Sequence, residues 1–197
     1  MSLFRTVIFC FALAAIIGCH TDEAPKPDAW PRVHYPVATD TIVFNDEDCP
    51  YTFSLPNYYE IDRNVTYFNQ TPDDPCWMNL VCKDLNATIY MSNKPIDVKY
   101  SYQQMIDDAY KLTYKHAGRA DYIEPQEIEN QYGVHGLIYY VGGDAASNFQ
   151  FFVTDTTSNF VRGALYFNNR PNADSLRPVI QFMVHDIENM LSGWRWK

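Results

Sequence analysis

VHGLIYYVGGDAASNFQFFVTDTTSNFVRGALYF, residues 134–167, is the stretch of sequence that decides the fold. It contains three largely apolar segments, at 134–141, 148–154 and 160–167, which are rich in the β-branched and aromatic residues that favour strands. The two short connections between these segments carry the Gly, Asn and Asp residues that turns prefer. We therefore predict three consecutive strands that form a meander.

Two helices are expected on either side of this meander in the sequence. Ser101 is a good N-cap and Gln104, three residues later, completes a capping box, so a helix begins there and ends at Gly118. A second helix starts after Asp174 as its cap and ends just before Gly193. Apolar residues recur at intervals of three and four in both segments, which is typical of helices with one buried face.

The rest of the chain supplies further short strands before and between the helices. Alternating apolar residues predict them, and Pro125 weakens the last one. They cover Tyr51–Leu55, Tyr58–Ile61, Trp77–Val81, Ala87–Met91 and Tyr122–Ile128. The order is strands, helix, strands, helix, so we predict an α+β fold in which an antiparallel sheet is flanked by two helices.

The N-terminus resembles the export signal of a bacterial lipoprotein. Its apolar run, Val7–Ile17, has eleven residues, roughly 16 Å as a helix against the ~30 Å of a membrane core. The run is therefore too short to span and suits a signal segment over residues 1–18. Ile16, Gly18 and Cys19 fit the pattern read by lipoprotein-processing enzymes, so Cys19 is the predicted lipid attachment site, with acyl chains holding the protein on a membrane.

Residues 19–48 are expected to form a tether, because four prolines between residues 25 and 36 disfavour regular structure. Its docked piece would be Ile42-Val43-Phe44, and residues 49–197 would form a single globular domain. The formal charge of the whole chain is −9 and becomes −10 once the signal with Arg5 is removed. This charge argues against a nucleic-acid partner.

Three cysteines follow the predicted anchor, so at most one internal disulfide can form. We favour Cys49–Cys76, because both lie in polar, proline-containing stretches and the exported compartment is oxidising. The alternative pair is Cys76–Cys82. No CxxC or CxH spacing occurs, so no metal site is expected at these thiols.

The sequence contains no recognisable catalytic motif. HExxH, GxSxG, phosphate-loop and GxGxxG patterns are all absent. The histidines at 34, 116, 135 and 185 lie in unrelated contexts. We therefore expect no enzyme activity, no small-molecule substrate and no cofactor besides the covalent lipid on Cys19.

Several segments together resemble the gliding-motility lipoprotein GldD family of the Bacteroidota. They are Pro25-Lys26-Pro27, Cys49-Pro50-Tyr51-Thr52-Phe53, Pro75-Cys76-Trp77, Asn86-Ala87-Thr88-Ile89-Tyr90, Leu112-Thr113-Tyr114-Lys115-His116 and the run 142–197. The resemblance implies a non-enzymatic accessory lipoprotein of the gliding and type IX secretion machinery. Its implied partners are other gliding lipoproteins, such as GldJ, and secretion components. For the fold, the order of elements suggests a Mog1/PsbP-like α-β-α sandwich.

The same resemblance bears on location and modification. The position after Cys19 is not the aspartate that retains enterobacterial-type lipoproteins in the inner membrane, so we expect the outer membrane, with the leaflet left open. Short motifs similar to the O-glycosylation motif of this phylum place candidate sites at Thr41, Thr156 and Ser175. Two other functions stay open: an envelope module that binds glycan or peptidoglycan, and an envelope hydrolase whose site gathers distant residues.

Overall fold

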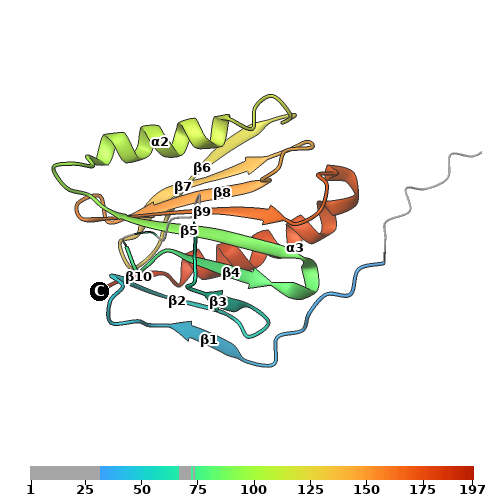
Figure 1. Ribbon diagram of the computed structural model, residues 1–197, viewed down its shortest axis with the longest axis horizontal. Coiled ribbons are helices and arrows are strands. Elements are labelled where there is room, and N and C mark those ends of the chain that lie inside the picture. Colours follow the sequence, from blue (N-terminus) through green and yellow to red (C-terminus); the bar gives the residue numbers. More distant parts are fainter. Residues whose placement is uncertain (1–31, 67–71, 73) are drawn as a thin grey trace, which may run out of the picture. The chain divides into compact units, whose positions relative to one another are not determined.

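Figure 1 shows a computed structural model of the chain, which describes residues 32–66, 72 and 74–197. The predicted signal segment, Cys19 and the first part of the tether lie outside the described residues. The elements are β1 (Thr41–Phe44), β2 (Tyr51–Pro56), β3 (Glu60–Asp62), β4 (Met78–Cys82), the 3-10 turn η1 (Lys83–Leu85), β5 (Ala87–Pro95), α2 (Tyr102–Tyr114), β6 (Ile123–Glu129), β7 (His135–Val141), β8 (Phe149–Thr154), β9 (Asn159–Phe167), α3 (Ala173–Ser192) and β10 (Arg195–Trp196). The predicted α+β class is confirmed.

Seven strands form one antiparallel sheet in the order β3-β4-β5-β9-β8-β7-β6. The predicted meander is confirmed as β7-β8-β9, and β9 continues onto β5 over nine residue pairs. A smaller sheet has the order β1-β2-β10. β6 forms one edge of the large sheet, which is where a strand tolerates a residue such as Pro125.

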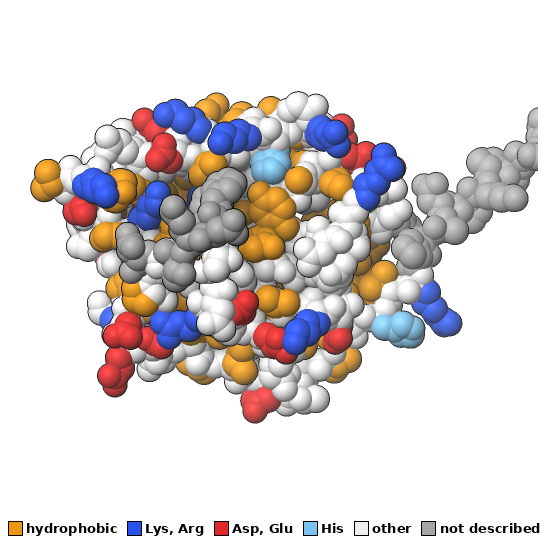
Figure 2. Space-filling view, in the orientation of Figure 1, with side chains coloured by type: hydrophobic (Ala, Val, Ile, Leu, Met, Phe, Trp, Pro, Cys, Tyr) orange, Lys and Arg blue, Asp and Glu red, His pale blue; other side chains and the backbone are white. Residues whose placement is uncertain are grey.

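The two helices cover opposite faces of the large sheet. Neighbouring residues of a strand point to opposite faces. On β8, Phe151 packs in the cluster that includes Met183 of α3, whereas Phe152 packs in the cluster that includes Met105 of α2. The sheet therefore lies between α2 and α3, as Figure 1 shows. In the space-filling view of the same orientation, Lys and Arg side chains lie along the side that carries α2 (Figure 2).

The helix ends differ from the prediction in detail. Ser101 and Gln104 do form the capping box, but α2 ends at Tyr114, four residues before Gly118. The N-cap of α3 is Asn172, whose side chain accepts a hydrogen bond from the Ser175 N–H, and not Asp174. Asp174 lies in the first turn, where its negative charge favours the positive end of the helix.

Part of the predicted tether belongs to the folded unit. Thr41–Phe44 pairs along its whole length with β2, and Phe44 is buried in the main core. Still earlier in the chain, the Tyr35 ring lies 4.9 Å from that of Phe182 on α3. The folded part of the chain therefore starts before the predicted boundary at Cys49.

Long-range contacts account for the remaining differences. The strand expected at Tyr58–Ile61 is shifted to Glu60–Asp62, because the hydroxyls of Tyr58 and Tyr59 turn to bind Asp186 on α3. The C-terminal residues form β10 against β2, and Trp194 beside it is fully buried against Tyr51 and Phe53.

Candidate functional site

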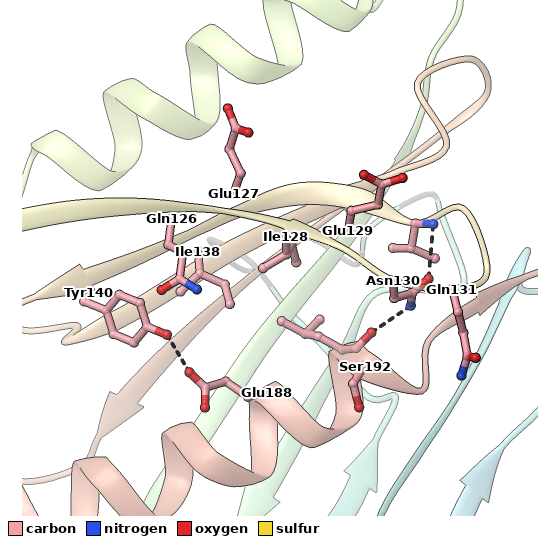
Figure 3. A pocket seen from close by; sticks show the side chains of 12 residues that line it. Gln126, Glu127, Ile128, Glu129, Asn130, Gln131, Ile138, Tyr140, Glu188 and Ser192 are labelled. Carbon is pink, nitrogen blue, oxygen red and sulfur yellow. Dashed lines mark hydrogen bonds between the residues drawn. The ribbon is translucent and has the colours of Figure 1, made fainter.

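A cavity of about 630 Å³ lies between the edge strand β6 and the C-terminal half of α3 (Figure 3). It is formed where the large sheet ends and the helix continues below its last two strands. The residues that line it are Gln126, Glu127, Ile128, Glu129, Asn130, Gln131, Val134, Ile138, Tyr140, Glu188, Leu191 and Ser192. We refer to this cavity as the β6–α3 groove.

The side chains of β6 point alternately to the two faces of the sheet, and this alternation determines which of them enter the groove. Gln126 and Ile128 point toward α3, whereas Glu127 and Glu129 point to the opposite side of the sheet (Figure 3). Ile128 packs on the main core, to which Val134, Ile138 and Leu191 also belong. The groove therefore has an apolar floor that is continuous with the core and a polar rim.

Tyr140 and Glu188 form the polar wall at one end of the groove. The Tyr140 hydroxyl donates a hydrogen bond to Oε1 of Glu188 across the space between β7 and α3. Burial, reinforced by this hydrogen bond, raises the pKa of Tyr140 to about 12. The phenol therefore stays protonated at neutral pH and holds the carboxylate in place, so it cannot act as a base there.

Asn130 closes the other end by joining the β6–β7 turn to the end of α3. Its Nδ2 donates to the carbonyl oxygens of Leu191 and Trp194, at 2.9 Å each. Its Oδ1 accepts from the backbone N–H groups of Tyr132 and Val134. One side chain thus binds backbone groups at the end of α3, just after α3 and in the β6–β7 turn, and fixes the groove wall.

The lining residues of the groove include acidic side chains and no basic ones. The Glu188 carboxylate faces the groove, those of Glu127 and Glu129 lie on the other face of β6, and none of the lining residues is Lys, Arg or His. Nδ1 of His135 lies 4.0 Å from Oε1 of Glu129, and the Arg195 guanidinium lies over the Tyr132 ring. The edge strand β6, which carries three Glu and no basic residue, therefore suits a positively charged partner better than an anion.

A second polar group is buried on the same helix. Asp186 accepts hydrogen bonds from the hydroxyls of Tyr58 (2.5 Å) and Tyr59 (3.1 Å), and Tyr59 is almost fully buried. Burial, with the hydrogen bonds to Asp186, raises the pKa of both phenols. This cluster fixes the β2–β3 connection on α3, and none of its three residues lines the groove.

A family model described as "Gliding motility lipoprotein GldD" matches residues 20–196, which is nearly the whole of the chain after Cys19. The chain belongs to the GldD family. None of the curated proteins matches it in sequence. Among solved structures, it is similar to the solution structure of cyanobacterial PsbP (CyanoP) from Synechocystis sp. PCC 6803, at 11% identity and a TM-score of 0.46, over 85% of this chain and 98% of that one.

The cysteines of this GldD family member have separate places in the fold. A disulfide joins Cys49 and Cys76, just before β2 and β4, with a Cα–Cα distance of 5.5 Å. Cys82 is a free thiol with no exposed surface, and burial raises its pKa. Cys82 is therefore a poor nucleophile. Cys19, the predicted lipid site, lies outside the described residues.

The three candidate O-glycosylation sites differ in exposure. Thr41 is exposed at the start of β1, and Thr156 is exposed in the β8–β9 turn. Ser175 lies in the first turn of α3 and is only partly exposed. The first two could accept a sugar without disturbing the core, whereas a sugar on Ser175 would crowd the start of the helix.

Within the part of the chain that the structure describes, no three His, Cys, Asp or Glu side chains come together as a metal site. No described helix is long and apolar enough to cross a membrane. The groove was not apparent from the sequence, because β6 and α3 are about sixty residues apart. The signal that could have indicated it is the acidic, proline-containing strand 123–129, whose charge is unusual for a central strand.

Proposed function

We propose that this GldD family member is a lipid-anchored accessory component of the envelope machinery for gliding motility and type IX secretion, and that it works through protein contacts without catalysis. The observation that carries the proposal is the family match over residues 20–196. The match starts directly after Cys19 and ends one residue before the last one given, so it covers nearly all of the chain that would remain after removal of a lipoprotein signal.

The chemistry of the described residues supports a role in binding. In the β6–α3 groove, the Tyr140 phenol is held protonated and occupied by Glu188. The buried carboxylate of Asp186 is occupied by two tyrosine hydroxyls. General acid–base catalysis requires a group whose pKa lies near the working pH and which can reach a substrate. The arrangement in the groove fits a surface that recognises a partner.

The proposed anchor limits where such contacts can occur. Thirteen peptide steps separate Cys19 from Arg32, the first described residue. A fully extended chain of that length spans roughly 45 Å at most. We propose an outer-membrane location, so the start of the folded unit at Arg32 would lie within about that distance of the bilayer. The partners that it would meet there are other gliding lipoproteins and secretion components.

A clean deletion of the gene tests this function. We expect the deletion strain to lose colony spreading and to accumulate type IX cargo inside the cell, and we expect the wild-type gene in trans to restore both. Normal spreading together with normal secretion in the deletion strain would refute the proposal. Spreading is scored by colony-edge microscopy and secretion by quantifying cargo in the medium.

A further inference from the structure

The large sheet ends in a strand that has room for a neighbour. β6 pairs with β7 on one side, and no described strand lies on its other side. Five of the seven residues of β6 are exposed. An edge strand of seven residues, about 23 Å long, offers backbone N–H and C=O groups along its outer side, except at the N–H that Pro125 lacks.

The groove lies on the α3 side of this edge. Side chains of a strand point alternately to the two faces of its sheet. In a strand added beside β6, every second side chain would therefore face α3, over the floor formed by Ile128, Ile138 and Leu191. The remaining side chains would lie with Glu127 and Glu129 on the other face. Backbone bonds along an edge combined with side-chain pockets are how many proteins bind extended peptides.

The charge of β6 selects what can pair with it. Glu124, Glu127 and Glu129 are all exposed carboxylates on a seven-residue strand that has no basic residue. Two copies of β6 side by side would place like charges near one another, which disfavours pairing between copies of this chain. A strand that carries Lys or Arg would instead gain favourable cross-strand pairs.

We infer that the outer edge of β6, together with the β6–α3 groove, binds an extended, lysine- or arginine-bearing segment of a partner protein as an eighth strand. The inference rests on the proposed function in one respect, that the protein works through protein contacts. Aliphatic side chains of the segment cover the apolar floor on the α3 side, and its cations meet Glu127 and Glu129 on the other face of the sheet.

The test uses the mature chain, residues 19–197, with Cys19→Ala so that it is soluble, and a capped seven-residue peptide in which lysine alternates with valine. Binding is followed by backbone amide chemical shifts and hydrogen exchange. We expect shifts and slower exchange at β6 amides. Glu127→Lys with Glu129→Lys should weaken binding about tenfold or more, whereas the matched reversal on α2, Asp107→Lys with Asp108→Lys, should change it less than about twofold.

A second peptide separates strand addition from simple charge attraction. It has the same charge but carries N-methyl groups on alternate residues along the edge that would pair with β6. We expect its affinity to fall about tenfold or more, since its backbone cannot complete the ladder. Equal binding of the methylated peptide, equal loss in the α2 variant, or shifts centred away from β6 would overturn the inference. None of these results would alter the deletion phenotype that tests the proposed function.

Discussion

Asn130 joins the β6–β7 turn to the end of α3 at one end of the groove, and its replacement tests how much this connection stabilises the fold. Asn130→Ala removes four hydrogen bonds: two to carbonyls at the end of α3 and two from N–H groups of the β6–β7 turn. Each such bond contributes about 1 kcal/mol net. Because the side chain is half-buried, water replaces part of the loss, and we expect the free energy of unfolding to fall by about 2–4 kcal/mol.

The assay is urea denaturation of the mature Cys19→Ala chain, followed by far-ultraviolet circular dichroism. With a slope of about 2 kcal/mol per molar urea, the midpoint should fall by roughly 1–2 M while the slope stays the same. The control is Gln131→Ala, the next residue in the chain and exposed, for which we expect a change within about 0.5 kcal/mol. If Asn130→Ala were as stable as this control, the view that Asn130 holds the groove wall would be refuted.

Three further perturbations test other parts of the structure. Trp194→Ala should lower the free energy of unfolding by about 3–5 kcal/mol in the same denaturation assay, because the ring is fully buried against Tyr51 and Phe53. Cys49→Ser with Cys76→Ser should lower it by about 3–4 kcal/mol on the chain-entropy model, and added reductant should then have no further effect on that variant. Burial alone would raise the pKa of Asp155, but hydrogen bonds from the N–H groups of its turn outweigh burial and lower the pKa. The ionised Asp155 carboxylate therefore stabilises the folded state above about pH 4. This stabilisation is lost as the pH falls through the lowered pKa. Denaturation of Asp155→Asn between pH 2.5 and 7 should accordingly show a deficit relative to the unsubstituted chain that shrinks in acid, and a deficit that grows in acid would contradict this sign.

Local chemistry explains what could be predicted from the sequence. The capping box of α2 needs only Ser101 and Gln104, three residues apart, and it forms as expected. The meander needs only short turns between apolar segments, and all three strands appear within one residue of the prediction. The prediction of Asp174 as the N-cap was wrong. Asn172, two residues earlier, is also a strong N-cap residue, and its side chain accepts the capping hydrogen bond.

Contacts between distant residues explain what could not be predicted. The side chain of Leu112 fits the apolar stripe of α2, yet it is 38% exposed because α2 lies with Met105, Ala109 and Thr113 against the sheet. β10 is only two residues long, and its partner β2 is more than 140 positions away. The groove likewise exists only once β6 and α3 are packed together, so the acidic, proline-containing strand 123–129 could indicate an edge strand but not the position of α3 beside it.

The proposed lipid anchor of this GldD family member is tested by Cys19→Ala introduced at the native locus. Membrane fractions, labelled-palmitate incorporation and colony spreading are measured in the same strain. We predict that the variant folds, takes up no palmitate and leaves the membrane fraction, and that the strain carrying it does not spread. A variant that still sediments with membranes, still takes up palmitate and spreads normally would contradict the account.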